Sequence, residues 1–483
     1  MRYRLMPLML LPLLAGCALG PTVPTPDTHT PVAFEAPTDI TKPGVPLDHW
    51  WTTYNDPQLE ALIALALTNA PDARSAYERL QDARAVRAGA LDSYNPQGSL
   101  QGSATDTYTN VIQGPAPIVL GPGFPPISFT NAGSTQDYGV NFNVSWEIDI
   151  FGRKRAARGK ANADLAAARL DDEATLTELE ASVADQLFQA RGLAIQLDDA
   201  REANRIDEQL ADIARKKADH GLGSSADADQ AAATAAQSAA EATDLEGQLH
   251  AARRTLLVLV GKGVDPLATL PADAVAGTPP AIPVTVPSDL LARRPDVREA
   301  AQNIRSASGQ LKLDELALFP KFTLTPGVGL TSEPLFGASL TDDVWSIGVG
   351  MVQPILDLPR LKTVIRSRGA QADEAVITYE KAVQTAYGES ENALVQLSAD
   401  EQRVRILTTG EAQARSAYDA ARKRYAYGID DLTSTLSAER TWRTTRTALT
   451  AAEVQALRRS VTAFKALGGG WTPGPVPEQQ AAR

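Results

Sequence analysis

The most reactive side chain in the sequence is the thiol of Cys17, the only cysteine of the chain. A short apolar run that begins with two arginines leads to Ala15 and Gly16, which stand directly before the cysteine. This order is typical of a secretory signal that ends in a lipidation site, because small residues fit the peptidase and a thiol accepts the lipid. We expect residues 1–16 to be a signal peptide and Cys17 to carry diacylglycerol and fatty acyl groups. The alternative is a chance cysteine at the end of an ordinary signal.

The residues after Cys17 indicate where the protein is held. Ala18 stands where an Asp keeps many bacterial lipoproteins in the inner membrane, which favours the outer membrane. Residues 17–48 are rich in Pro and Thr and predict an extended, lipidated leash. Because no second cysteine is available, no internal disulfide is expected and packing must hold the fold.

The other reactive groups do not form a catalytic or metal-binding arrangement. Gly221, Gly223 and Ala226 match a dinucleotide fingerprint by letters, but a charged helix precedes them where a buried strand is required. Glycines that end a helix explain the same letters. Nearly all carboxylates lie on predicted helix faces near Arg or Lys, and solvated faces explain them. We expect no enzyme, no metal and no cofactor besides the lipid. The histidines, none in a metal-ligand spacing, are His29, His49, His220 and His250.

Two acidic clusters are the remaining candidates. Asp227 and Asp229 follow one helix-ending glycine, and Asp430 and Asp431 follow another. If the two turns gather around an axis, the carboxylates could line a mouth that selects cations and closes across subunits. Equally, Asp is favoured in the first turn of any helix, where exposed N–H groups stabilise it. The sequence leaves both interpretations open.

The elements that would position these residues come in two copies. Pro-Asp-Ala-Arg at Pro71 recurs as Pro-Asp-Val-Arg at Pro295, and Pro96 and Pro320 recur at the same separation. Each copy runs from a short helix through two strand-like stretches to a very long helix that turns and comes back. This order predicts two internal structural repeats. The predicted divisions are a first repeat (49–261), an equatorial linker (262–287), a second repeat (288–467) and a C-terminal tail (468–483).

The strand-like stretches alternate apolar and small polar residues. From Tyr138 to Trp146 the even positions are apolar and the odd positions are Gly, Asn or Ser. The length approaches the ~9–11 residues of a transmembrane strand, with one face for lipid and one for water. The alternative is a strand of a soluble sandwich. Four strands cannot close a barrel alone but three sets can, which predicts a trimer. The predicted strands are about 97–109, 137–149, 321–331 and 343–353, with an additional exposed loop at 110–136.

A helical period covers most of the remaining chain. The first long stretch has no proline and predicts a helix of about 100 Å. Leu176, Val183, Ala190 and Leu197 recur every seven residues, which predicts helices that supercoil around neighbours. The net charge of −12 is unsuited to nucleic acid, so none is expected as a partner. The predicted long helices are about 154–219, 226–259, 361–427 and 432–467.

These residues together resemble the TolC family of outer-membrane efflux proteins, specifically its lipidated NodT-type members. The resemblance covers almost the whole chain after the signal peptide. It is carried by Cys17 to Pro21, Trp50-Trp51 with Asp56-Pro57, Arg293 to Arg298, Phe319-Pro320, Gln353-Pro354 before Asp357, and Arg424-Tyr425 with Gly428.

The resemblance implies an α+β membrane protein that is a homotrimer. Four strands per protomer would build one outer-membrane β-barrel, continuous with a long periplasmic α-helical coiled-coil barrel. The implied partners are a periplasmic adaptor, an inner-membrane RND-type transporter and outer-membrane lipid. The implied function is the outer-membrane channel of a tripartite efflux pump, a passive exit duct for drugs or other small molecules.

The resemblance also implies that the closed periplasmic end lies at the glycine turns. Tyr425 matches a family position that takes part in the links holding that end shut. Where the family often has Leu or Asp on the following helix, this chain has Thr433, Ser434 and Ser437. We hypothesise that the two aspartates nearer the tip substitute for them. The expected aperture residues are Asp227, Asp229, Tyr425, Asp430, Asp431, Thr433 and Ser437. The expected adaptor contacts, within 221–225 and 428–431, are Gly221, Leu222, Gly223, Gly428 and Ile429.

Three other functions are alternatives to this one. The outer-membrane duct of a type I protein secretion system would have a similar sequence, and neighbouring genes would separate the two. A lipoprotein scaffold or adhesin with coiled-coil stalks predicts no pore, and the alternating strands argue against it. A cell-wall enzyme would require a catalytic constellation that the sequence does not show.

Overall fold

The computed structural model divides into two compact units. The predicted signal peptide, Cys17, most of the loop at 110–136 and nearly all of the predicted tail lie outside the described residues. The described residues are 23–29, 31–37, 41–110, 112, 121–123, 133–271, 273–275, 277–283, 285–335 and 338–470. The first unit includes Arg84–Asp164 and Arg305–Glu374, and the second consists of Thr25–Ala83, Leu165–Ile304 and Ala375–Arg483.

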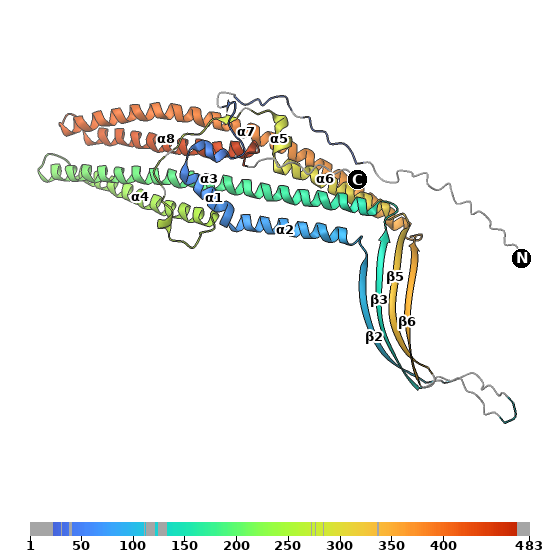
Figure 1. Cartoon of the computed structure of the whole chain (residues 1–483). Coiled ribbons are helices and arrows are strands. Elements are labelled where there is room, and N and C mark those ends of the chain that lie inside the picture. Colours follow the sequence, from blue (N-terminus) through green and yellow to red (C-terminus); the bar gives the residue numbers. More distant parts are fainter. Residues whose placement is uncertain are drawn as a thin grey trace. The chain divides into compact units, whose positions relative to one another are not determined.

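The first unit contains an antiparallel sheet of four strands in the order β2-β3-β5-β6 (Figure 1). The central pair joins one strand from each predicted copy, with Asn141 opposite Gly329 and Val140 opposite Leu330. The two halves of the sequence therefore share one hydrogen-bonded sheet. The strands are β2 (Gln97–Thr109), β3 (Gly133–Ile148), β5 (Lys321–Leu335) and β6 (Ala338–Val352).

Three of these strands extend beyond the predicted alternation. β3 begins at Gly133 instead of 137, β5 continues to Leu335 instead of 331, and β6 begins at Ala338 instead of 343. In these extensions the backbone ladder continues, for example from Thr105 opposite Asp137 to Thr109 opposite Gly133. Backbone pairing needs no apolar side chain, so the loss of alternation did not mark the strand ends.

The two faces of the sheet differ in chemistry. One face carries large, exposed apolar side chains such as Phe142, Trp146 and Trp345. On the opposite face, polar side chains lie over glycines of the neighbouring strand: a Cβ on Gly327 would stand 2.9 Å from Oδ1 of Asn143. The pattern recurs at other glycines of the polar face. The further pairs are Asn141 over Gly329, Thr325 over Gly348 and Thr323 over Gly350.

The charges of the polar face lie at its two ends. At one end Nζ of Lys321 lies 2.8 Å from Oε2 of Glu147. At the other end the register places Asp137 opposite Thr105 and Asp342 opposite Thr331. The rows between them are neutral on this face, with Gln, Ser, Asn, Thr, Gly and one Val.

In each half of the sequence two short helices precede the strands, and a very long helix and a returning helix follow them (Figure 1). α3 and α7 have 67 and 69 residues, and each is followed by a returning helix of 35 residues. The predicted seven-residue stripe is buried at Val183, Ala190 and Leu197. The helices are α1 (Pro57–Asn69), α2 (Pro71–Asp92), α3 (Arg153–Asp219), α4 (Ser225–Leu259), α5 (Pro287–Arg293), α6 (Pro295–Leu316), α7 (Leu358–Ala426) and α8 (Leu432–Ala466).

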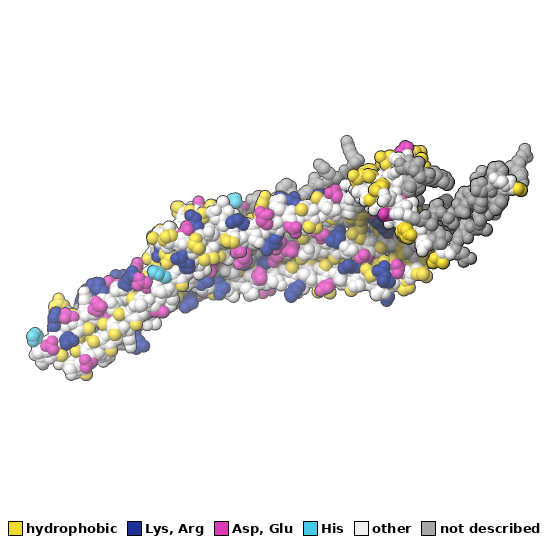
Figure 2. All heavy atoms as spheres, turned by 90° about the horizontal axis from the view of Figure 1, so that it is seen from below, with side chains coloured by type: hydrophobic (Ala, Val, Ile, Leu, Met, Phe, Trp, Pro, Cys, Tyr) yellow, Lys and Arg dark blue, Asp and Glu magenta, His cyan; other side chains and the backbone are white. Residues whose placement is uncertain are grey.

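The core of the second unit forms around Trp50, which is fully buried. Its ring stacks on Phe464 of α8 at a centroid distance of 5.6 Å. The surrounding cluster draws on α1, α3, α4, α7 and α8, so residues from both halves of the sequence share this core. On the face shown in Figure 2, acidic and basic side chains are interspersed along the helices.

The predicted linker contains more regular structure than its composition indicates. Leu267–Thr269 forms a 3-10 turn, and Ile282–Pro283 (β4) pairs in parallel with Thr41–Lys42 (β1) of the predicted leash. Arg253 of α4 donates from Nε to the carbonyl of Leu270 at 2.9 Å. Backbone hydrogen bonds and arginine donors thus fix a proline-rich stretch that lacks a helical or strand period.

Within the described part of the chain, no helix has both the length and the apolar character needed to cross a membrane.

Gly261, which follows α4, has a backbone that only glycine adopts easily. Its φ is +76°, and an added Cβ would collide with the backbone of Asn69. Gly247, inside α4, has open space around it. We therefore expect Gly261→Ala to lower the free energy of unfolding by about 2 kcal/mol or more. Gly247→Ala should raise it by about 0.5–1 kcal/mol. Thermal unfolding followed by circular dichroism measures both changes. Equal effects of the two substitutions would contradict the left-handed backbone and close contact assigned to Gly261.

Candidate functional site at the hairpin tips

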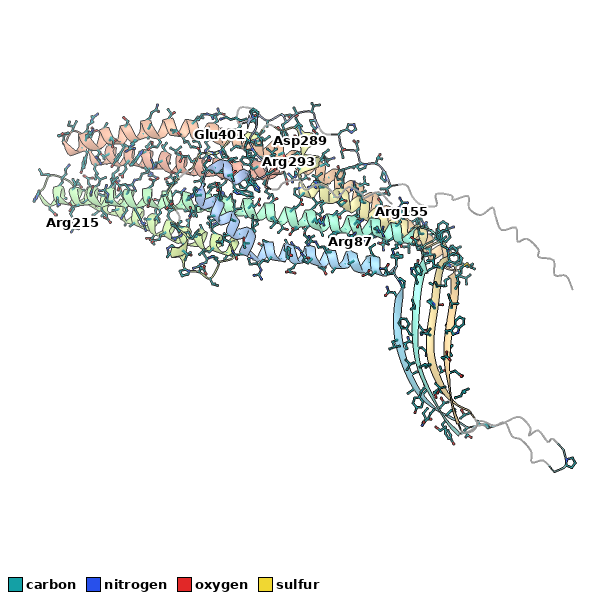
Figure 3. All side chains as sticks on the ribbon, viewed as in Figure 1. Arg87, Arg155, Arg215, Asp289, Arg293 and Glu401 are labelled. Carbon is teal, nitrogen blue, oxygen red and sulfur yellow. The ribbon has the colours of Figure 1, made fainter. Side chains whose placement is uncertain are left out.

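The first tip is the turn between α3 and α4. Leu222 N donates to the carbonyl of Lys217 at 2.8 Å, and Gly221 N to that of Ala218 at 3.0 Å. This pair of bonds closes a helix with a left-handed glycine, and Gly221 has a φ of +72°. Oγ of Ser224 then accepts from Ala226 N at 3.1 Å and caps α4. Arg215 lies near this tip, close to the end of α3 (Figure 3).

The second tip, between α7 and α8, repeats the same turn. Ile429 N donates to the carbonyl of Arg424 at 2.9 Å, and Gly428, with a φ of +68°, donates to that of Tyr425 at 3.0 Å. The cap of the returning helix is Asp431, whose Oδ1 accepts from Ser434 N at 2.7 Å. The two turns therefore have equivalent backbone hydrogen bonds although their sequences differ.

The structure assigns different contacts to the two aspartates of the second tip. Asp431 caps α8, as the helix-capping interpretation predicts. Asp430 instead forms a two-pronged ion pair with Arg424, with both nitrogen–oxygen distances at 3.0 Å. Arg424 thus ties the end of α7 to the turn that follows it.

Asp227 and Asp229 are exposed on the first turns of α4. Among the described residues, no hydrogen bond or ion pair joins them to the aspartates of the second tip. Thr433 and Ser437 are also exposed, on α8. One chain by itself therefore does not bring the predicted acidic residues together.

Tyr425 is buried and links the two hairpins. The ammonium of Lys217, near the end of α3, lies 3.9 Å from the centroid of the Tyr425 ring. Such a cation–π contact is worth about 0.5–2 kcal/mol, depending on its exposure to water. The sequence pattern did not identify Lys217 as part of this contact. Its only signal was a basic residue in the last turn of a helix, which the helix dipole also explains.

Apolar side chains at both tips are exposed to water. Leu222 is 78% exposed and Ile429 is 67% exposed. Tyr427, which the sequence analysis did not single out, is 82% exposed. Exposed apolar side chains next to glycine turns are suited to protein contacts.

Ion pairs between α3 and α8 hold the hairpins together above the tips. Arg458 of α8 binds both carboxylate oxygens of Asp185 on α3, at 2.6 and 3.0 Å. Arg446 donates to Asp199 at 3.0 Å, and Arg443 to Asp207 at 2.7 Å. Asp207 is buried, so the prediction that these carboxylates lie on solvated faces is wrong for this residue. Its sequence signal was an acid in the buried stripe that contains Leu193, Ala200 and Ala214.

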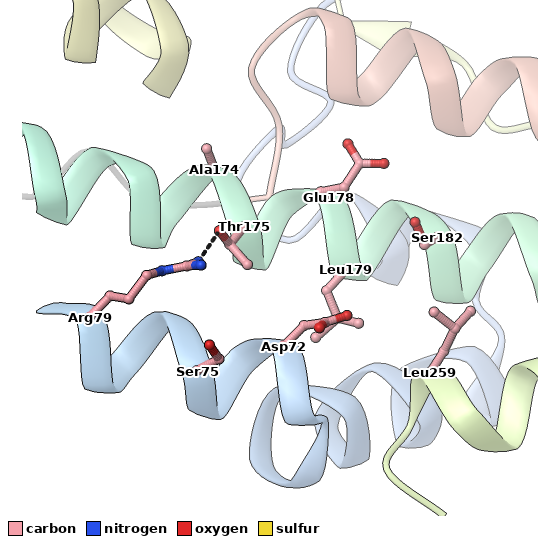
Figure 4. A pocket seen from close by; sticks show the side chains of 9 residues that line it. All are labelled: Asp72, Ser75, Arg79, Ala174, Thr175, Glu178, Leu179, Ser182 and Leu259. Atoms are coloured by element: carbon pink, nitrogen blue, oxygen red, sulfur yellow. Dashed lines mark hydrogen bonds between the residues drawn. The ribbon is translucent and has the colours of Figure 1, made fainter. Parts of the chain in front are cut away.

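An open groove runs between α2 and α3, away from the tip residues (Figure 4). Arg79 of α2 donates to Oγ1 of Thr175 across it at 3.4 Å. Asp72, Ser75 and Glu178 also line it, and no nucleophile with an adjacent base is among its residues. No group of potential metal ligands was found in the described part of the chain.

Known proteins share this sequence pattern and architecture. The sequence profile described as "Outer membrane efflux protein" matches residues 62–262 and 286–469. The pyoverdine export outer membrane protein OpmQ of Pseudomonas putida is 28% identical over 470 residues, covering 96% of this chain and 97% of that protein. The toluene efflux pump outer membrane protein TtgC of Pseudomonas putida is 27% identical, with coverages of 95% and 94%.

Solved structures agree with the sequence matches. The outer-membrane channel OprN has a TM-score of 0.78 and 27% identity, covering 93% of this chain and all of that one. The Campylobacter jejuni channel CmeC has a TM-score of 0.81 over 95% of this chain and 96% of its own, and at 20% identity it shows the fold alone. The architecture is that of an outer-membrane channel. The chain belongs to the outer membrane efflux protein family, the family of TolC-type channels, whose members are transport channels and not enzymes.

Asp431 could stabilise the second tip through its capping oxygen or through its negative charge, and two substitutions distinguish these roles. Asp431→Ala should lower the free energy of unfolding by about 1 kcal/mol, because the N–H of Ser434 loses its acceptor. Asp431→Asn should change it little, since an asparagine oxygen caps equally well. Denaturation of the purified protein measures both. An equal loss in the two variants would show that the charge, and not the cap, stabilises the turn.

Proposed function

We propose that this chain is the outer-membrane subunit of a tripartite efflux pump and forms a passive exit duct for drugs or other small molecules. The observation that carries the proposal is the four-stranded sheet with one apolar and one polar face. A single chain leaves Phe142, Trp146 and Trp345 exposed, and it leaves the edges of β2 and β6 without partners in the described sheet. Lipid would cover the apolar face, and further copies would pair the edges.

Three copies would supply twelve strands for one barrel, with the polar face lining the channel. The band from Ile148 to Tyr138 supports this, because these residues along β3 span about 33 Å of strand. Tilted by about 40°, such strands give an apolar band of about 25 Å, the height seen in outer-membrane barrels. The long α3 and α7, each about 100 Å, would form the periplasmic tunnel.

The lipid on Cys17 would hold the trimer at the membrane through the leash. The described part of the leash already lies against α7. Asp27 N donates to Glu380 at 2.8 Å and Glu35 N donates to Glu391 at 3.1 Å. These contacts support an anchored leash with a fixed path in place of a free linker.

The partners would be a periplasmic adaptor at the tips and an inner-membrane RND-type transporter that supplies the energy. The exposed apolar residues of the tips, Leu222 and Ile429, support a protein contact there. The names of the relatives support the pump: TtgC is named as part of a toluene efflux pump, and CusC of Escherichia coli as a cation efflux system protein.

Accumulation of dyes and antibiotics tests the proposed export. Cells that lack this protein should accumulate at least one compound of a broad panel, and the restored gene should reverse the accumulation. The physical reason is that an open exit duct is required for the pump to move its cargo outside. No change for any compound, combined with proteins missing from the medium, would favour a type I secretion duct instead.

The aspartates of the second tip are proposed to make the closed end cation-selective. Replacing Asp430 and Asp431 with Asn should lower the preference for cations in planar-bilayer recordings, because it removes two negative charges per chain from the proposed mouth. Asparagine preserves the cap on α8, so the fold should survive. A variant with Glu241→Gln and Asp244→Asn, exposed residues further along α4, serves as the control. Unchanged conductance and cation preference in the tip variant would refute this role.

A further inference from the structure

The ion pairs between α3 and α8 differ in how well their charges balance. Asp185 and Arg458 form a pair of one acid and one base, and both side chains are about one-third exposed. The set nearest the tips has two acids and one base. Asp207 comes from α3, and Glu439 and Arg443 come from α8. Water can stabilise a partly exposed pair, but it cannot stabilise an uncompensated charge that is buried.

Burial at this set is nearly complete for both carboxylates. The side chain of Asp207 is fully buried and that of Glu439 is 3% exposed. Arg443 donates to Asp207 at 2.7 Å and to the carbonyl of Ala203 at 2.8 Å, and it also contacts Glu439. One guanidinium therefore serves two acids, and Oδ1 of Asp207 has no hydrogen-bond partner.

The groups around Glu439 do not supply a second positive charge in direct contact with it. From α7, Tyr418 interacts with Glu439; burial raises the pKa of Tyr418 to about 12, so it stays neutral near pH 7. Arg422 of α7 lies beside Tyr418. The α4 residues in the surrounding core are Ala231 and Ala228, and neither is charged. With both carboxylates ionised, the set would keep one uncompensated negative charge in the core.

A proton on Glu439 removes that charge. Burial is the largest cause that raises the pKa of Glu439, Arg443 opposes the shift and Asp207 adds to it, and together they bring the pKa to about 7. The ordinary value is 4.5, so the folded state binds this proton more tightly than the unfolded chain does. The stabilisation from the proton is fully present below the ordinary value of 4.5. It is lost as the pH rises through about 7.

We propose that Asp207, Glu439 and Arg443 form a proton-dependent latch that holds the α7–α8 hairpin against α3 near the tips. With Glu439 protonated, Arg443 bonds Asp207 across the hairpins without an excess charge. Loss of the proton places two carboxylates from different hairpins against each other, and the hairpins separate at the tips. The balanced pair of Asp185 and Arg458 keeps the hairpins joined further from the tips. The link to duct opening rests on the proposed function, but the latch itself does not.

The latch is tested by the distance between the tips. Leu222→Cys and Ile429→Cys, both exposed, would carry spin labels in the full chain, diluted with unlabelled chains so that one labelled copy is present per assembly. Pulsed electron resonance would measure the distance between the two labels at pH values from about 5.5 to about 8.5. We expect a longer-distance population to appear with a midpoint near pH 7. An unchanged distance in the unsubstituted latch would overturn the proposal.

Variants of the latch identify the responsible group. Glu439→Gln should keep the short distance at every pH, because glutamine cannot lose the proton. Glu453→Gln, a matched change on α8 away from the latch, should leave the transition in place. A transition that persists in Glu439→Gln would overturn the proposal.

A second variant covers the case in which Glu439→Gln does not fold. Asp207→Asn removes the repelling acid, so the midpoint should fall by at least about one pH unit. An unmoved midpoint in Asp207→Asn would also overturn the latch. The outcome is separate from export. Cells that export normally with a pH-independent tip distance would refute the latch alone, and a pH-dependent distance without any export would refute the duct alone.

Discussion

The backbone pairing of β3 with β5 is the interaction on which the first unit depends. It joins a strand from each half of the sequence, and its register sets which residues face the same side. Because side chains alternate along every strand, a slip of one residue would exchange the apolar and polar faces. The side chains also fix the register. Asn141 fits over Gly329, but after a slip of one residue it would meet the side chain of Val328 or Leu330.

In the second unit, side-chain contacts join the two halves of the sequence, where the first unit uses backbone hydrogen bonds. Its core around Trp50 is apolar and draws on both halves. Towards the tips the contacts become ionic, with acids on α3 and bases on α8. A largely apolar cluster with Tyr418, Tyr425 and Leu432 lies beyond these pairs, nearer the tips. Towards the tips the hairpins are thus held by ion pairs and apolar contacts together.

The sequence predicted the elements in which a residue pattern repeats. It did not predict individual contacts between side chains of different helices. Alternation located four strands and the seven-residue stripe located the long helices, although it did not show that β3 begins at Gly133. Glycines at the tips were recognisable because the turn requires a left-handed backbone. The pairing of Lys217 with Tyr425 and the burial of Asp207 depend on which faces of two helices meet. That choice is made by packing over many residues, so neither contact has a local sequence signature.

The neutral middle of the polar face has a mechanical consequence. Side chains that lie flat over glycines leave a wall of low relief, and no fixed charge interrupts it between Lys321 with Glu147 at one end and Asp137 with Asp342 at the other. A solute moving along such a wall meets neither a deep electrostatic well nor a ridge. In the proposed duct, the rate of passage along this wall would therefore depend less on the charge of the solute than on its size.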